Sequence, residues 1–250
     1  MKEVLKKEML RLENLKVKVK DEVILENINL SLNEGVHVLL GPNGTGKSTL
    51  LGAIMGLSKY KVSGKIWFYN EDITELSPDQ RFKKGIFLAY QLPPAVRGVR
   101  LKDILKKILN IDPKKSLPDE VYTYLRELDL DESFLEREIN YGFSGGERKK
   151  SEILQLLLAK PKLAMLDEPD SGVDIDSLKL IGENLRKISK ESNLLIVTHN
   201  LKILDYVNTD SVVVLLDGKY IYKDGIEIIH QIEERGYEYV RRLAYAQNLS

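Results

Sequence analysis

The sequence predicts an α/β fold in which a parallel β-sheet forms the core, a smaller antiparallel β lobe precedes it, and a helical segment is inserted into it. Three observations predict this fold. Apolar and polar residues alternate through much of residues 11–32, which is typical of half-buried strands. A glycine-rich loop at 41–49 separates a short apolar run from a helical pattern. From residue 143 onward, helical and strand-like segments alternate, which favours parallel strand pairing.

The first third of the chain is predicted to be rich in strands. Four segments read as strands because apolar residues alternate or β-formers cluster in them: "RLENLKVKVK" (11–20), "VILENINLSL" (23–32), "GKIWFYN" (64–70) and "GIFLAYQ" (85–91). Between them, the continuous apolar run "VHVLL" (36–40) predicts a fully buried strand. A helix is expected from Ser48 to Leu57. These elements make up the antiparallel lobe and the start of the parallel core.

The periodicity changes to a helical one between Leu101 and about Arg137, where apolar residues recur at three- and four-residue spacing. We expect residues 92–142 to form a helical subdomain inserted in a single domain that covers residues 1–250. After it, strands are expected at "LAMLD" (163–167), "LLIVTH" (194–199) and "SVVVLL" (211–216), with helices between them. Residues 1–8 are expected to be an N-terminal extension, or to precede a true start at Met9.

Composition excludes several classes of protein. The 250 residues are 43% hydrophobic and 30% charged, as in soluble globular proteins, and no apolar run approaches the roughly 20 residues that cross a bilayer. Lysine plus arginine equals aspartate plus glutamate, 38 against 38, so no net field favours nucleic acid. The chain has no cysteine and therefore cannot hold a thiolate-ligated metal by itself. The first ten residues lack a secretion signal, and we expect a cytoplasmic protein.

The stretch "GPNGTGKST" matches the phosphate-loop pattern G-x-x-x-x-G-K-[ST]. In such a loop, the glycines let backbone N–H groups turn toward phosphate oxygens, the lysine reaches the β- and γ-phosphates, and the serine hydroxyl ligates Mg²⁺. An apolar strand before the loop and a helix after it provide the expected context. The residues predicted to bind ATP are Gly41, Pro42, Asn43, Gly44, Thr45, Gly46, Lys47, Ser48 and Thr49.

Two acids close the predicted strand "LAMLD", which continues as "EP". At the carboxyl end of a strand next to a phosphate loop, Asp167 is placed to hold Mg²⁺ through water. Glu168, one residue further, is placed to accept a proton from a water molecule that attacks the γ-phosphate. The alternative is a pair of exposed acids at a strand end. Because adjacent residues of a strand point to opposite sides, the two acids are expected to have different tasks.

The stretch "FSGGERKKSE" (143–152) contains a capping box, since Ser144 and Glu147 fit S-x-x-E at a helix start. Three cations, Arg148 to Lys150, then follow at the end of the helix where the dipole is positive and acids are normally found. This arrangement favours an anion nearby. The alternative is an ordinary helix start with solvated lysines.

The motifs "GPNGTGKST", Gln91, "FSGGE", "LDEP", "SGVD" and "VTHN" follow one another in an order that resembles the nucleotide-binding domain of ABC-type ATPases. The resemblance covers residues 9 to about 235. It implies that two domains pack head to tail, with ATP between the phosphate loop of one and the signature motif of the other. It also implies Mg²⁺ bound by Ser48, Gln91 and Asp167. By motif, the implied signature is Ser144, Gly145, Gly146 and Glu147, the implied D-loop is Ser171, Gly172, Val173 and Asp174, and the implied catalytic residues are Glu168, His199, Lys47 and Gln91.

Within this superfamily, "YQLPPAVRGV", "FSGGERKKSEILQ", "LDEPDSGVDIDSLK", "VTHNLKILDYV" and "QIEERGYEYV" resemble the SufC family, the ATPases of SUF-type iron–sulfur cluster assembly. This resemblance implies SufB/SufD-type scaffold partners that supply the cysteines, and an ATP-dependent homodimer of ATPase domains within the complex. The first alternative is the ATPase subunit of an ABC membrane transporter. The second, an ABC protein acting on nucleic acid, is disfavoured because the insertion at 92–142 is too short for a long coiled coil.

Two further expectations concern single residues. No Phe, Tyr or Trp precedes Tyr60, so an adenine contact before the phosphate loop must be aliphatic, with Val17, Val19 or Val23 as candidates. We therefore expect weak nucleotide affinity and poor discrimination between ATP and GTP, because a stacking term of about 1–3 kcal/mol is missing. We also expect that Lys149 has a regulatory role and pairs with Glu168 in the resting monomer.

Overall fold

The computed structural model describes residues 7–199 and 201–248. Most of the expected extension at 1–8 lies outside the described residues, and β1 (Glu8–Val19) begins within it. β1 pairs antiparallel with β2 (Glu22–Asn33) on one side and β4 (Tyr60–Phe68) on the other, and β5 (Glu71–Asp72) completes the order β2-β1-β4-β5. From Leu25 to Leu32 of β2, apolar side chains are buried and the residues between them are half-buried or exposed, as the alternation predicted, whereas Val23 is exposed. The antiparallel lobe is thereby confirmed.

The second sheet forms the core, in the order β10-β9-β3-β8-β7-β6. Five of its strands run parallel, and only β10 at the edge is antiparallel. All residues of β3 and β7 are buried, because both faces of a parallel sheet are covered. The strands are β3 (Val36–Leu40), β6 (Ile86–Ala89), β7 (Leu163–Asp167), β8 (Asn193–Val197), β9 (Ser211–Leu216) and β10 (Tyr220–Asp224).

Two apolar clusters hold the layers together. Helix α1 (Lys47–Met55) packs with the antiparallel sheet and one face of the parallel sheet, so the helix that follows the glycine-rich loop is fixed on two sides. The other face of the parallel sheet packs against α5 (Gly145–Ala159), α6 (Ile175–Ile188) and the inserted helices. Helix α2 (Pro78–Lys83) precedes β6.

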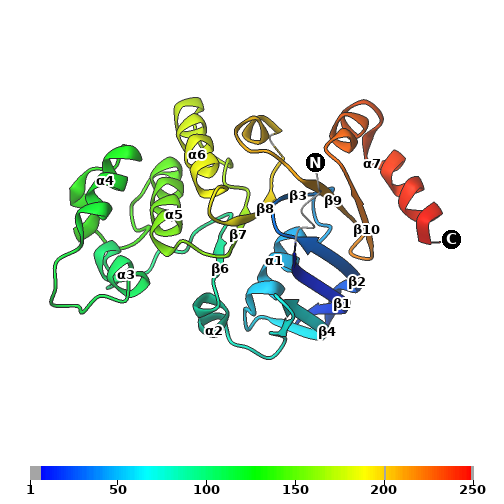
Figure 1. The fold of residues 1–250 in the computed structure, drawn as a ribbon, viewed down its shortest axis with the longest axis horizontal. Helices are drawn as coiled ribbons and strands as arrows, with labels where there is room; N and C mark the ends of the chain where they lie inside the picture. The colour runs from blue at the N-terminus through cyan, green and yellow to red at the C-terminus, as the bar shows by residue number, and fades with distance from the viewer. Residues whose placement is uncertain (1–6, 200, 249–250) are drawn as a thin grey trace.

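The inserted segment folds into α3 (Leu101–Ile108), α4 (Asp119–Glu127) and the 3₁₀ helix η1 (Glu132–Glu136). Figure 1 shows α3 and α4 at the end of the molecule opposite to α7. Two prolines separate the helices: Pro113 follows α3, and Pro118 is the N-cap of α4. We keep residues 92–142 as the proposed limits of this subdomain.

The C-terminal region contains elements that we did not predict. After η2 (Leu201–Tyr206), strand β10 adds an antiparallel edge, and α7 (Glu227–Asn248) packs Val240 and Ala244 into the core. A non-helical backbone at Gly236 (φ 70°, ψ 176°) divides α7 into two parts, which Figure 1 shows beside β9 and β10. In the described part of the chain, no helix combines the length and the apolar character that a membrane span requires.

Candidate nucleotide-binding and catalytic site

The glycine-rich loop connects β3 to α1 and needs glycine at two of its tight positions. Gly41 has a φ of 150°, and a Cβ there would collide with the carbonyl oxygen of Leu215. Gly46 caps α1 in the left-handed region (φ 99°), and a Cβ would lie 2.7 Å from Leu25 Cδ2. At these two positions, the loop passes so close to β9 and the antiparallel lobe that there is no room for a side chain. This geometry brings backbone N–H groups and the α1 dipole to one end of the helix, as an anion site requires.

Lys47 lies inside this loop and is only 6% exposed. Its Nζ donates hydrogen bonds to the carbonyl oxygens of Gly41 (2.7 Å) and Pro42 (3.0 Å). Burial lowers the pKa of Lys47, and the carboxylates of Glu168 and Asp167 oppose this shift. The ammonium is thus held against the backbone, close to both acids of the β7 end.

Asp167 ends β7 and is 7% exposed. Burial raises the pKa of Asp167, while a hydrogen bond from the Ser48 hydroxyl opposes the rise. The Oδ1 atom of Asp167 is buried and has no hydrogen-bond partner. An unsatisfied carboxylate oxygen next to an exposed hydroxyl is a donor set that suits Mg²⁺, which prefers few protein oxygens and keeps water and phosphate ligands. Among the described residues, no group of three or more His, Asp or Glu side chains offers a metal site by itself.

The carboxylate of Glu168 contacts two side chains that follow neighbouring strands. Its Oε2 accepts a hydrogen bond from Gln91 Nε2 at 2.7 Å, and His199 Nε2 lies 3.3 Å from its Oε1. Gln91 follows β6, Glu168 follows β7 and His199 follows β8. Because these strands are parallel neighbours, their carboxyl ends bring the three side chains to one edge of the sheet.

The backbone of Glu168 turns sharply away from the strand. Its φ is 49°, which is uncommon for a residue other than glycine. Its N–H donates to the carbonyl of Val197 (2.9 Å), and its carbonyl accepts from Ser171 N–H (3.1 Å). Asp167 and Glu168 therefore have different surroundings, one buried near Ser48 and the other between Gln91 and His199.

The capping box at the start of α5 is confirmed. Ser144 Oγ accepts from the N–H of Glu147 (3.2 Å), and Glu147 Oε2 accepts from the N–H of Ser144 (2.7 Å). A Cβ at Gly145 would lie 2.8 Å from the carbonyl oxygen of Gly172, so the helix start touches the 171–174 loop. The last residue of that loop, Asp174, caps α6 by accepting from Ser177 N–H (2.7 Å). The signature and D-loop candidates of one chain thus form a single surface.

The expected pairing of Lys149 with Glu168 is wrong in this structure. Lys149 is 4% exposed, and its Nζ donates to the backbone carbonyl oxygen of Tyr90 at 2.6 Å. Its nearest carboxylate is Glu152 (3.7 Å), one helical turn along α5. The reason is the orientation of α5, which turns this side chain inward under the end of β6, while Glu168 turns toward Gln91.

The alternative of solvated lysines is also wrong for the neighbouring cation, because Lys150 is only partly exposed and pairs with Asp129 of the inserted segment (3.1 Å). The side chains at 149 and 150 thus diverge, as consecutive residues of a helix do. Lys149 faces the interior and Lys150 faces the inserted helices, so neither is free for a ligand.

Three residues near the site were not predicted. Glu152 binds the backbone N–H of Tyr90 (2.7 Å), and Ile24 Cγ2 would lie 3.3 Å from a Cβ at Gly46. Burial raises the pKa of Tyr237 of α7, and a hydrogen bond from the backbone N–H of Gly41 opposes the rise. Glu152 and Tyr237 lie within the segments "FSGGERKKSEILQ" and "QIEERGYEYV", but these segments do not reveal the contacts, because all three contacts depend on long-range packing. Among the candidates for adenine, Val17 is wrong because it is completely buried, whereas Val23 is 39% exposed.

The loop geometry and the acids at the strand tips define the class of this protein as a P-loop ATPase. The sequence profile of the ABC transporter family matches residues 25–171. This match spans more than half of the chain. The chain therefore belongs to the ABC transporter family, and it carries the ATP-hydrolysing cassette of that family.

Relatives and solved structures agree with this assignment. A probable ATP-dependent transporter, ycf16 of Cyanidium caldarium, is 41% identical over 246 residues, which cover 94% of this chain and 97% of that protein. The ADP conformation of an ATP-binding cassette of an ABC transporter is 30% identical, covers 91% of this chain and 95% of its own, and has a TM-score of 0.70. The dimeric post-hydrolysis state of another cassette, bound to ADP and Pi, shares the fold at 22% identity (TM-score 0.71, 87% and 99% covered).

Proposed function

We propose that this ATPase drives a SUF-type iron–sulfur cluster assembly scaffold, with two copies that close on ATP and strain a bound partner. The support is the resemblance of five sequence segments to the SufC family, among them "FSGGERKKSEILQ" and "LDEPDSGVDIDSLK". The chain has no cysteine, so the cluster ligands must belong to partners of the SufB/SufD type. Transfer of strain to the scaffold is the step that hydrolysis serves.

The observation that carries the hydrolytic part of this proposal is the convergence of Gln91 and His199 on Glu168. In the proposed reaction, the water oxygen bonds to the γ-phosphorus while the bond to the β-phosphate oxygen breaks. Glu168 takes the proton that the water loses. Contacts at both oxygens fix the orientation of this carboxylate. A general base held in position typically raises the reaction rate by about 10²–10⁴-fold.

The phosphate loop and the end of β7 hold the nucleotide in this proposal. Lys47 moves from the carbonyls of Gly41 and Pro42 to the β- and γ-phosphates, and the loop N–H groups bind phosphate oxygens. Ser48, Asp167 and Gln91 would hold Mg²⁺. When bound, Mg²⁺ offsets the charge that develops on the phosphate oxygens.

ATP binding between two copies explains the exposed start of α5. Ser144 and Gly145 are exposed and present the N-terminus of a fifteen-residue helix to the outside. A helix N-terminus attracts anions, and here it is proposed to contact the triphosphate on a second chain. ATP-binding cassettes dimerise, and one cassette of this fold is described as a dimer.

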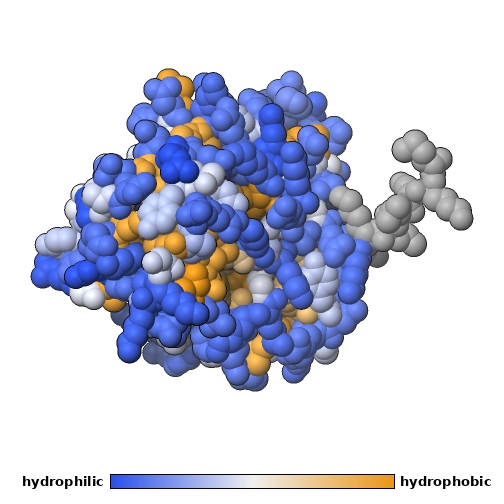
Figure 2. All heavy atoms as spheres, turned by 60° about the vertical axis from the view of Figure 1, so that its left-hand side comes forward, coloured by the Kyte–Doolittle hydropathy of each residue, from blue (hydrophilic) through white to orange (hydrophobic). Residues whose placement is uncertain are grey.

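A surface next to Gln91 suits a protein partner. Leu92 is 80% exposed, Val96 42% and Tyr141 48%. We call these three residues the Q-loop patch. Exposed apolar side chains on one surface are typical of interaction sites. Figure 2, with the helical end turned forward, shows that apolar atoms also reach the surface of this face in a hollow ringed by polar side chains.

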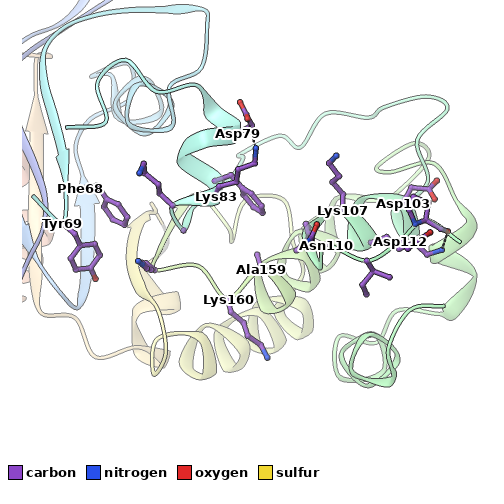
Figure 3. A pocket seen from close by; sticks show the side chains of 18 of the residues that line it. Phe68, Tyr69, Asp79, Lys83, Asp103, Lys107, Asn110, Asp112, Ala159 and Lys160 are labelled. Atoms are coloured by element: carbon purple, nitrogen blue, oxygen red, sulfur yellow. Dashed lines mark hydrogen bonds and ion pairs between the residues drawn. The ribbon is translucent and has the colours of Figure 1, made fainter. Parts of the chain in front are cut away.

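A groove of about 1570 Å³ lies between α2, α3 and the C-terminal end of α5. Figure 3 shows its lining, from Phe68 and Tyr69 of the antiparallel lobe to Asp112 after α3. Lysines outnumber acids in this lining: Lys83, Lys84, Lys106, Lys107, Lys160 and Lys162 against Glu71, Asp79, Asp103 and Asp112. Three of these lysines are already paired, Lys83 with Asp79, Lys84 with Glu71 and Lys160 with Glu120, so most of the positive charge in the lining is balanced.

The second candidate function is the ATPase subunit of a membrane transporter, because the relative from Cyanidium caldarium is named a probable ATP-dependent transporter. Purification of the tagged chain from both soluble and membrane fractions discriminates between the two. We expect cysteine-bearing scaffold proteins that bind an iron–sulfur cluster, and loss of them with Leu92→Asp plus Tyr141→Asp while ATP binding persists. Capture of integral membrane proteins through the same patch would instead establish the transporter function.

A further inference from the structure

Two ionisable side chains of α5 bind both polar groups of one residue in the neighbouring strand end. Lys149 Nζ donates to the carbonyl oxygen of Tyr90 at 2.6 Å, and Glu152 Oε1 accepts from the N–H of Tyr90 at 2.7 Å. Lys149 is 4% exposed and Glu152 is 6% exposed. Because residues three apart lie on the same side of a helix, the two side chains reach the same target from adjacent turns.

Tyr90 is the point where the backbone leaves the sheet. β6 ends at Ala89, whose partner in β7 is Leu166, so Tyr90 follows the last residue of the ladder. Its N–H and C=O must find partners outside the sheet, and α5 provides both. The next residue is Gln91, whose amide lies 2.7 Å from Glu168 Oε2.

This arrangement is costly if its only purpose is stability. Two charged side chains are buried, their closest approach is 3.7 Å, and the Oε2 atom of Glu152 has no hydrogen-bond partner. A buried ion pair is weak evidence for stabilisation, because desolvation offsets much of the attraction. Apolar side chains of similar size would serve the packing equally well, so the polar atoms that bind Tyr90 indicate a functional reason for these two residues.

We propose that Lys149 and Glu152 are positioning residues that hold Tyr90 and thereby set Gln91 against Glu168. The start of α5 carries the candidate signature, so the same helix links the surface that meets a second chain to the base of its own chain. A shift of α5 upon ATP binding is transmitted through these two hydrogen bonds to the Gln91 amide. The inference rests on the proposed role of Gln91 in hydrolysis.

The test is steady-state hydrolysis of Mg-ATP by full-length variants. Glu152→Leu removes the acceptor for Tyr90 N–H, and we expect kcat to fall by roughly tenfold or more while KM changes less than about twofold, because the phosphate loop is untouched. Glu152→Gln keeps an acceptor oxygen in the same place and is expected to retain most of kcat. Lys150→Met, one residue along α5, removes an ion pair with Asp129 and is the matched control with unchanged kcat.

Two measurements separate positioning from a structural role. Wild-type kcat in Glu152→Leu overturns the inference, and so do equal losses in the Leu and Gln variants accompanied by a lower Tm. If Glu152→Leu does not fold, Lys149→Met gives the same test, with the same expected loss of kcat at constant KM and the same overturning result.

Gln91→Ala distinguishes a failure of the inference from a failure of the proposed function. Normal hydrolysis in Gln91→Ala refutes the assigned role of Gln91 and, with it, the inference. Loss of hydrolysis in Gln91→Ala together with normal hydrolysis in Glu152→Leu refutes the positioning inference alone.

Discussion

Glu168 is held at both carboxylate oxygens and in a left-handed backbone conformation, which costs on the order of 1–3 kcal/mol. Residues with such backbone strain are concentrated at functional sites, where the surrounding structure compensates for it. The neighbouring Asp167 is buried and has an unsatisfied oxygen. At this scale, two adjacent acids have different surroundings because the chain turns between them.

Replacing the proposed base tests that assignment. Glu168→Gln keeps the size of the side chain but cannot accept a proton, so kcat should fall by on the order of 10²-fold or more while ATP still binds. We expect closed dimers to accumulate with ATP, measured by light scattering after gel filtration. Near-normal hydrolysis in this variant would remove Glu168 from its role.

Glu152 predicts a pH dependence of stability. Burial raises the pKa of Glu152 from 4.5 to about 7, and the Lys149 ammonium opposes this shift. The folded state therefore holds this proton more tightly than the unfolded state. The resulting stabilisation is fully present below pH 4.5 and is lost as the pH rises through about 7.

Glu152→Gln cannot ionise and should not show this loss. The unfolding free energy of the variant minus that of the wild type should increase by roughly 3 kcal/mol between acid and neutral pH. Urea titrations at several pH values measure it. A difference that stays constant over this range would contradict the raised pKa.

At the residue scale, predictions from the sequence succeeded where the local backbone conformation determines which residue type is needed. Spacing alone predicted the glycines of the loop and the capping box of Ser144 and Glu147. It failed for Lys149, because its partner depends on how α5 lies against β6 and not on the order of residues. Gln91 and His199 could be related to Glu168 from motif order, but their contacts required the parallel neighbours β6, β7 and β8.

At the scale of elements, the turn between β9 and β10 supports the phosphate loop. Gly218 in this turn has a φ of 66°, and a Cβ there would collide with the carbonyl oxygen of Ile24. Its own carbonyl accepts from Glu26 N–H (2.8 Å). Arg241 of α7 binds both carboxylate oxygens of the adjacent Asp217 (2.9 and 3.1 Å). The C-terminal elements thus hold the turn that touches β2 beside the loop.

Gly218→Ala should therefore destabilise the protein by more than the roughly 1 kcal/mol of left-handed strain alone. Gly98 is the matched control, since its φ is 78° but nothing lies within 4 Å of a Cβ. We expect a larger decrease in Tm for Gly218→Ala than for Gly98→Ala, measured by calorimetry. Equal decreases would show that the turn does not press on β2.

Elements were predicted unevenly from the sequence. The alternation in β1 and β2 and the apolar runs of β3, β7 and β9 predicted their strands, because burial imposes those patterns. β10 and α7 were missed, since β10 is a mixed edge strand and α7 is interrupted at Gly236. The inserted segment was predicted as helical, and Pro113 and Pro118 lie between α3 and α4. No proline lies between α4 and η1, which begins after the N-cap Asp131.

At the scale of the whole molecule, the account depends on a site shared between two chains. The phosphate loop and Glu168 lie at the end of the parallel sheet, whereas Ser144 and Gly145 form an exposed helix start adjoining the 171–174 loop. Hydrogen-bond donors that face the charge developing in a transition state raise the reaction rate about 10²–10³-fold. A chain that lacks its partner's signature should therefore hydrolyse ATP slowly.

Complementation between two inactive variants tests this claim most directly. Lys47→Ala removes the phosphate-loop cation and keeps the signature, whereas Ser144→Arg blocks the signature and keeps the phosphate loop. Each variant alone should hydrolyse little ATP, and mixing them should restore hydrolysis, because a mixed pair contains one intact site. Full activity of Ser144→Arg alone, or a mixture as inactive as its components, would contradict the shared site.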